Sequence, residues 1–352
     1  MTSKPSADDH PPGSPSNAGA LGKLYWAVRN PPIDPTVSFN GKTVLVTGAN
    51  TGLGFQAAFK YAALGASRLI LGVRSIHKGE AAKKEIVRRT GCRAENITVL
   101  QADLSTFASV QAFVEQLNAL ERLDVALLNA GLATPTYSAG PGGWEIALQV
   151  NVLSTALLAI LLLPKLHDTA SRTKTTPHLS FVNSVAHQEV TPDWLHADKS
   201  LIQQINDPTA FDDRRQYALV KLASSYVTLG LLETLRPKDV IIINAACPGL
   251  CRTDLGRDWP WYSKLPVVLF QAIFARTAEQ GSRTLVSATA LGAESNGKLW
   301  TNDTYAPISE LVSSEKGQRL RRQTWGEIVS ILKQHAPQVE TIMNGGTARD
   351  GA

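Results

Sequence analysis

The sequence predicts an α/β fold: a doubly wound parallel sheet of about seven strands with helices on both faces. Two observations predict it. Short, unbroken apolar runs, which are typical of strands covered on both faces, alternate with segments of helical periodicity. The first of these runs ends in three spaced glycines, as at a tight turn into a helix. Alternation of this kind gives parallel strands joined by right-handed crossovers.

The predicted elements follow one another in regular order. The strands are 43–46, 68–72, 97–101, 125–128, 179–182, 240–244 and 298–300. The helices are 53–64, 77–90, 105–120, 142–166, 213–235 and 277–291. Two connections, 185–212 and 254–277, are longer than plain loops, and long loops in compact domains are usually functional. Both should emerge at the carboxyl ends of strands, where ligands bind in such sheets.

The glycine-rich turn runs from Thr47 to Gly54. Gly48 lets the chain turn, Gly52 lets the backbone approach a ligand, and Gly54 lets the next helix pack close to the strand. The N–H groups and positive dipole end of that helix can hold a pyrophosphate. The turn therefore favours a Rossmann-type dinucleotide site, although glycine-rich turns also occur for steric reasons alone.

The end of the second strand bears on the choice of cofactor. A site for NAD takes an acidic residue there, bonded to the ribose 2′-hydroxyl. In this chain Arg74 stands at that place with Lys78 nearby, and the first acidic residue is Glu80. A guanidinium pairs well with phosphate, so we expect NADP(H). The alternative is that Arg74 stacks on the adenine and leaves the preference loose.

Three residues could carry chemistry. Tyr217 and Lys221 are four apart on a predicted helix and share one face, where an ammonium would favour the phenolate. Tyr217 could then exchange a proton with a carbonyl or alcohol oxygen. Ser184 follows a predicted strand, where its hydroxyl could bond a substrate oxygen or merely start a turn.

Other chemistries fit the chain poorly. A hydrolase would need His187 as base for Ser184, but no Gly-x-Ser-x-Gly elbow surrounds the serine. No histidine pair has metal-ligand spacing and there is no Cys-x-x-Cys, so we expect no metal. The basic clusters at 83–89 and 319–322 lack interleaved aromatics, so we expect no nucleic acid despite the net charge of +5.

Composition bounds the class of protein. The 352 residues are 43% hydrophobic and 18% charged, which is ordinary for a soluble globular chain. Three cysteines make no disulfide framework, so we expect a reducing, cytoplasmic location. The apolar segment Leu153–Leu163 is too short to span a bilayer and predicts a buried helix.

The chain reads as one domain with extensions. Residues 1–20, rich in Pro, Ser, Gly and Asp, predict a disordered tail. Residues 21–40 form an N-terminal extension, in which Leu21–Arg29 has helical spacing and can pack on the domain or touch a membrane surface. The catalytic domain then takes 41–335, and 336–352 form a C-terminal tail.

Taken in order, these motifs resemble the short-chain dehydrogenase/reductase family over about Gly41 to Asn302. Besides the glycine turn, Ala102-Asp103-Leu104 resembles the acidic site beside the adenine, and Asn129-Ala130-Gly131 resembles the family's Asn-Asn-Ala-Gly. The first Asn of that motif is Leu128 here, a departure that touches sheet packing more than chemistry. Pro248-Gly249-Leu250 with Thr253 resembles the stretch that meets the nicotinamide.

The resemblance implies a role for each site residue. Tyr217 would be the acid/base, Lys221 would lower its pKa and bind the nicotinamide ribose, and Ser184 would steady the reacting oxygen. Asn151 would hold a water that links Lys221 to solvent. The implied cofactor-binding residues are Gly48, Asn50, Gly52, Leu53, Gly54, Arg74, Lys78, Asp103, Asn129, Tyr217, Lys221, Leu250 and Thr253.

The substrate is expected to be a bulky hydrophobic ketone, aldehyde or alcohol. Ser184 and Tyr217 are 33 positions apart, which resembles the retinol-dehydrogenase-like branch and fungal enzymes of natural-product pathways. Residues 254–277, with Trp259, Trp261 and Phe270, predict a lid over such a substrate; a core helix, an oligomer interface or a membrane contact are alternatives. A retinoid or steroid dehydrogenase and a non-catalytic nucleotide-binding regulator remain alternative functions, and a homo-oligomer stays open.

Overall fold

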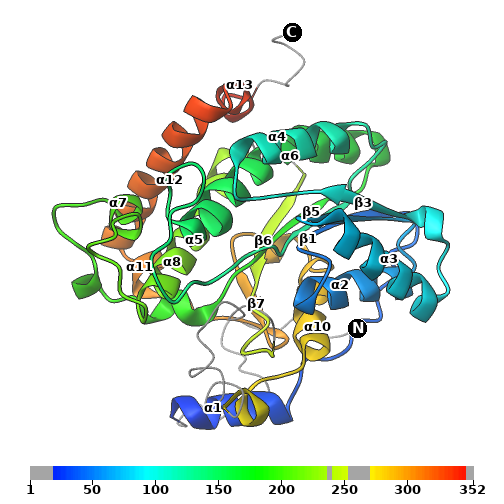
Figure 1. The fold of residues 1–352 in the computed structure, drawn as a ribbon, viewed down its shortest axis with the longest axis horizontal. Coiled ribbons are helices and arrows are strands. Elements are labelled where there is room, and N and C mark those ends of the chain that lie inside the picture. Colours follow the sequence, from blue (N-terminus) through cyan, green and yellow to red (C-terminus); the bar gives the residue numbers. More distant parts are fainter. Residues whose placement is uncertain (1–18, 236–239, 253–269, 346–352) are drawn as a thin grey trace.

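A computed structural model describes residues 19–235, 240–252 and 270–345 as one eight-stranded sheet with helices on both faces (Figure 1). The strand order is β3-β2-β1-β4-β5-β6-β7-β8. The strands are β1 Thr43–Thr47, β2 Arg68–Val73, β3 Ile97–Gln101, β4 Val125–Leu128, β5 His178–Val182, β6 Ile242–Ala246, β7 Leu299–Thr301 and β8 Thr304–Tyr305. All neighbours pair in parallel except β7 and β8. The predicted α/β fold is confirmed, with β8 as a short addition.

Both faces of the sheet are covered because its strands are apolar throughout. Within β1, Leu45 faces one buried cluster while Val44 and Val46 face the other. The helices of the first layer are α4 Phe107–Asn118, α6 Thr155–Thr173 and α8 Gln216–Thr234. Those of the second layer are α2 Gly52–Ala63, α3 Ile76–Thr90 and α10 Ala278–Ala288. The sheet thus forms the middle of three layers.

Several elements lie outside the predicted set. They are α7 Leu201–Ile205, α11 Glu310–Ser313, α12 Glu315–His335 and α13 Gln338–Met343, with short turns η1 Ala94–Asn96, η3 Val185–Glu189, η4 Pro192–Trp194 and η6 Ala293–Ser295. Helix α1 Ala20–Arg29 lies where the extension has helical spacing, and α5 Ile146–Leu148, η2 Gln149–Ser154 and α6 together take the place of the helix predicted at 142–166. The segment expected to be a C-terminal tail contains α13, whose Val339 and Ile342 are buried. Their apolar contacts join that helix to the core, so the packed domain continues beyond 335.

The most apolar helical stretch lies inside the protein. The helical stretch Ile146–Thr173 contains an 18-residue window that is long and apolar enough to cross a membrane, with mean hydropathy 2.3, and 94% of that window is buried in the fold. Its neighbours are α4 and α8, so this stretch is a core helix, as the sequence predicts.

Two expected features fall partly outside the described residues. The predicted tail of residues 1–20 lies outside them up to residue 18. The predicted lid, 254–277, lies outside them from 254 to 269, and Thr253 of the predicted cofactor site lies outside them as well. At its described end, Phe270 and Phe274 stack with ring centroids 4.9 Å apart, and Ile273 is 55% exposed.

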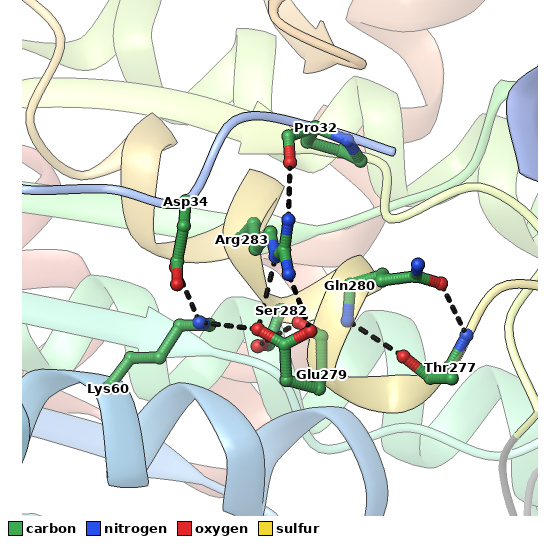
Figure 2. A network of polar contacts seen from close by, with 8 residues as sticks. All are labelled: Pro32, Asp34, Lys60, Thr277, Glu279, Gln280, Ser282 and Arg283. Carbon is green, nitrogen blue, oxygen red and sulfur yellow. Dashed lines mark hydrogen bonds and ion pairs between the residues drawn. The ribbon is translucent and has the colours of Figure 1, made fainter. Parts of the chain in front are cut away.

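The N-terminal extension is fastened to the domain by buried cations. Lys60 of α2 lies between Asp34 of the extension, at 2.5 Å, and Glu279 of α10, at 2.7 Å (Figure 2). Arg283 of α10 pairs with Glu279 and donates to the carbonyl of Pro32 at 3.1 Å. These contacts hold residues 32–34 against α2 and α10, two of the three helices of the second layer.

A second anchor lies at the start of the extension. Arg276 is 2% exposed and donates to the carbonyls of Ala27, at 2.8 Å, and Asn30, at 3.2 Å. It also donates to the side chain of Asn302, and the neighbouring Asp303 accepts the N–H of Ile33 at 2.7 Å. The end of α1 is therefore held by Arg276, which also binds the turn between β7 and β8.

Replacing Lys60 with methionine is expected to lower the free energy of unfolding by about 1–2 kcal/mol, because the change leaves two carboxylates without their shared cation. Glu279 and Asp34 are partly exposed, which limits the loss. Denaturant unfolding measures it, with Lys84→Met, at an exposed lysine of α3, as the control. Equal stability of the two variants would contradict the prediction.

Candidate active site

The glycine turn joins β1 to α2 in the geometry that the sequence predicts. Gly48 and Gly52 have positive φ angles of 67° and 58°, which favour glycine. A Cβ on Gly54 would lie 2.4 Å from Asn129 Nδ2 and from the carbonyl oxygen of Gly48, so no side chain fits there. The N-cap residue of α2, Thr51, makes no side-chain capping bond to the helix. The first turn of α2 therefore offers its N–H groups at the edge of the sheet.

Asn129 locks this turn to the end of β4. Its side-chain Nδ2 donates to the carbonyl of Thr47 at 2.9 Å, and its N–H donates to Thr47 Oγ1 at 2.9 Å. Ala130 donates to the same hydroxyl at 3.0 Å. Thr47 is buried, and its hydroxyl thus aligns two strand ends, a role that sequence reasoning missed. Leu128, the departure from the family motif, is buried in β4.

Two cationic side chains lie beside the end of β2. Arg74 follows directly after the strand and is exposed, as is Lys78 in the first turn of α3. Ser75 caps α3 by accepting the N–H of Lys78 at 3.4 Å, which fixes the backbone below both cations. Asp103, after β3, accepts the N–H of Ser105 at 3.0 Å. This edge can thus present positive charge to an anion held at the turn into α2.

The predicted catalytic residues meet at the carboxyl end of β5. Ser184 follows that strand and makes a side-chain hydrogen bond with Tyr217. Lys221 Nζ donates to the carbonyl of Val182, the last residue of β5, at 3.2 Å. The same Nζ lies 5.7 Å from the centre of the Tyr217 ring. A hydroxyl, a phenol and an ammonium thus converge where β5 and α8 adjoin.

Burial dominates the electrostatics of this cluster. It raises the pKa of Tyr217 to about 12, against a smaller lowering by the bond with Ser184. Burial also lowers the pKa of Lys221 to about 8. In the polypeptide alone, the Tyr217 pKa is not lowered by Lys221 as expected, because burial removes water from the phenol and raises its pKa. Tyr217 therefore holds its proton at neutral pH.

Asn151 reaches the site by its backbone. It lies in η2, a π-helical turn inside the long helix, and such turns often occur at functional sites. Its side chain binds the backbone of Leu132, with Oδ1 accepting at 2.9 Å and Nδ2 donating at 2.7 Å. Its carbonyl oxygen accepts from Ser224 Oγ at 3.4 Å, on the helix that carries Lys221. The side chain holds the loop after β4 in place.

Two further residues hold Ser184, and a third holds its neighbour Val185. Asn183 Oδ1 accepts the N–H of Ser184 at 2.9 Å, and Asn183 Nδ2 donates to Ser225 Oγ of α8 at 2.9 Å. His187 Nδ1 lies 2.7 Å from the carbonyl oxygen of Ser184, so this ring nitrogen contacts the backbone. Cys247 Sγ accepts the N–H of Val185 at 3.4 Å. Proximity to the end of β5 is the only sequence signal for Asn183.

The remaining predictions concern the loop after β6 and metals. The carbonyl of Leu250 accepts the N–H of Arg276 at 2.8 Å, which ties this loop to the start of α10. Among the described residues, no group of three or more His, Cys, Asp or Glu side chains could hold a metal ion.

Comparison with known proteins places this chain in a family. The sequence pattern described as short chain dehydrogenase matches residues 42–196. The short-chain dehydrogenase/reductase ffsI of Aspergillus flavipes is 44% identical over 92% of this chain and 96% of its own length. The short-chain dehydrogenase/reductase phmF of Phaeosphaeria nodorum is 43% identical over 92% of this chain and 96% of its own length. The chain belongs to the short-chain dehydrogenase/reductase family, and it is an oxidoreductase.

Solved structures agree on the fold. An uncharacterized protein from Mycobacterium paratuberculosis has a TM-score of 0.61 at 22% identity, over 89% of this chain and 97% of its own. L-Sorbose reductase from Gluconobacter frateurii, complexed with NADPH and L-sorbose, has a TM-score of 0.56 at 20% identity, over 76% of this chain and 97% of its own. The family pattern stops at residue 196, inside the long connection that separates Ser184 from Tyr217.

Proposed function

We propose that this chain is an NADP(H)-dependent oxidoreductase that interconverts a ketone or aldehyde and an alcohol on a bulky hydrophobic substrate of fungal secondary metabolism. One observation carries the proposal: Ser184, Tyr217 and Lys221 converge at the carboxyl edge of the sheet. Ligands of doubly wound sheets bind at this edge. The fungal relatives named above support the metabolic setting.

The chain's own residues divide the work of carbonyl reduction. Ser184 donates to the substrate oxygen and holds it beside Tyr217. Tyr217, protonated at neutral pH, gives its phenolic proton to that oxygen as negative charge develops there. Lys221, charged at pH 7, faces the phenolate that remains and lowers its energy. NADP(H), when bound, supplies or accepts the hydride.

The polypeptide fits such a cofactor at two places. A Cβ on Gly54 would clash with Asn129 and Gly48, and the turn leads to the N–H groups of α2, which suit a pyrophosphate. Arg74 and Lys78 are exposed beside the end of β2, where a 2′-phosphate can pair with both. L-Sorbose reductase, of the same fold, was solved with NADPH.

A hydrophobic substrate is supported by the described end of the predicted lid. Phe270 and Ile273 are 39% and 55% exposed, next to the loop that follows β6. Large apolar side chains exposed beside a catalytic edge commonly line ligand sites.

Buried thiols at Cys247 and Cys251 support a reducing, cytoplasmic location.

A turnover assay tests the proposal. The purified chain is incubated with NADPH or NADH and a panel of ketones that ranges from small to bulky and apolar, and products are identified by mass spectrometry. We expect reduction with NADPH and a higher kcat/KM for the bulky members. Product without change in nicotinamide absorbance would indicate an isomerase. Cofactor binding without any product would favour a non-catalytic nucleotide-binding regulator.

Replacing Arg74 with aspartate is expected to lower the NADPH/NADH ratio of kcat/KM by about 10- to 100-fold, or roughly 1.4–2.8 kcal/mol. The carboxylate repels the 2′-phosphate and accepts the ribose hydroxyl of NADH instead. Arg322→Asp, at an exposed arginine of α12, makes the same charge change away from the site and serves as the control. An unchanged ratio in Arg74→Asp would remove Arg74 from cofactor selection.

A further inference from the structure

Glu145 is a carboxyl group with no exposed surface, located just before α5. Its Oε2 accepts the N–H of Leu148 at 2.8 Å and so caps that short helix. Glutamate is almost never fully buried unless it is paired or hydrogen-bonded. The partners of Glu145 therefore indicate what the group does.

These partners come from three other segments of the chain. Glu145 Oε1 accepts from Thr134 Oγ1, in the loop after β4, at 3.4 Å. The side chain of Gln216, the first residue of α8, also hydrogen-bonds the carboxyl. The N–H of Glu145 donates to Asn206 Oδ1, just after α7, at 2.7 Å. Burial raises the pKa of Glu145, and the N–H groups of Leu148 and Ala147 oppose that rise.

Each side-chain contact leads to a site residue. Gln216 directly precedes Tyr217, and it is itself fixed by donating to the carbonyl of Ile205 at 3.0 Å. On the other side, α5 continues into the π-helical turn that carries Asn151. Thr134 lies two residues after Leu132, whose backbone binds the Asn151 side chain. One carboxyl thus bridges the helix starts behind Tyr217 and Asn151.

We propose that Glu145 is a positioning residue that sets the placement of Tyr217 relative to Asn151 and to the long connection between Ser184 and Tyr217. The inference rests on the proposed oxidoreductase function. An acid that is displaced by about 1 Å from its substrate oxygen can lose about 100-fold in rate. A glutamine at 145 keeps the shape but puts an amide NH2 where an acceptor is needed.

The test compares Glu145→Gln with a matched loss of a helix cap. We expect Glu145→Gln to lower kcat about 10- to 100-fold and to leave the NADPH Kd within about twofold, since the residues proposed to hold the pyrophosphate and the 2′-phosphate lie in other segments. Ser314 caps α12 by accepting the N–H of Gly317 at 3.1 Å. Ser314→Ala should lower the melting temperature by about as much as Glu145→Gln does, and it should leave kcat unchanged. Parent-like kcat in Glu145→Gln would overturn the proposal.

Amide hydrogen exchange supplies a readout that needs no turnover. In Glu145→Gln, residues 216–221 should exchange faster than in the parent, while exchange in α12 stays the same. Unchanged exchange at 216–221 would overturn the inference. A parent chain that reduces no carbonyl would instead remove the proposed function, and the exchange result would still decide the role of Glu145.

Discussion

Replacing Tyr217 with phenylalanine is expected to lower kcat for carbonyl reduction by about 10²- to 10⁴-fold, the usual contribution of a positioned general acid. Phenylalanine keeps the ring near Lys221 and removes only the hydroxyl that bonds with Ser184. The Kd of NADPH should change by less than about 0.5 kcal/mol, because the pyrophosphate and 2′-phosphate contacts lie elsewhere. Steady-state kinetics and fluorescence titration of NADPH measure the two quantities.

Tyr226→Phe is the matched control on the same helix. Its hydroxyl is buried and donates to the carbonyl of Leu311 at 2.8 Å, away from the catalytic residues. Its loss should lower the melting temperature and leave kcat close to that of the parent. A Tyr217→Phe enzyme that keeps more than a few per cent of kcat would show that another group supplies the proton.

Replacing Lys221 with methionine is expected to stabilise the fold at neutral pH while it removes most of the activity. Burial lowers the pKa of Lys221 from 10.5 to about 8, so folding at pH 7 carries the cost of a desolvated ammonium. That cost is roughly 3 kcal/mol, offset by about 1 kcal/mol from the bond to the carbonyl of Val182. Methionine has neither the desolvation cost nor the hydrogen bond, so the free energy of unfolding of the variant should be higher by about 1–3 kcal/mol.

The stability difference between Lys221→Met and the parent should depend on pH. Between about pH 8 and 10.5 the unfolded parent binds more protons at Lys221 than the folded parent, so parental stability rises with pH in that window. The advantage of Lys221→Met should be full below pH 8 and shrink as the pH approaches 10.5. Urea unfolding at pH 7 and pH 10 measures it. A variant less stable than the parent at pH 7 would contradict it.

The sheet could be predicted from the sequence because its strands are buried on both faces. Ile97–Gln101 and Val125–Leu128 agree with the prediction at both ends, since apolar runs and flanking polar residues mark them clearly. The strand predicted at 240–244 is shifted: β6 begins at Ile242, and Val240 is 54% exposed. A run of valine and isoleucine does not show which of its residues enters the sheet.

Helix α12 carried a signal that the sequence analysis did not use. Thr324, Ile328 and Leu332 are buried at intervals of four, after the N-cap Ser314. Its many charged residues hide this stripe in a simple search for apolar runs. In contrast, the hydrogen bonds of η2 give no sequence pattern, because π-helical turns form where packing requires them.

The proposed catalytic residues could be chosen from the order and spacing of motifs, whereas the residues that support them could not. Tyr217 and Lys221 share a helix face, which the four-residue spacing alone indicates. Glu145, in contrast, meets Asn206 across 61 positions, and such a contact exists only once the chain has folded. The pKa of Tyr217 depends on how much solvent the fold excludes, which no local pattern contains.

The anchoring of the N-terminal extension also bears on folding during synthesis. The partners of Ala27, Pro32 and Ile33 lie about 250–270 residues later in the chain. At about 5–20 residues per second, a ribosome needs roughly 12–50 s to supply them. The strands β1 to β4 emerge well before then, while the extension must wait for α10 and the turn after β7. The extension, although it is synthesised before β1, is thus among the last segments to be fixed in place.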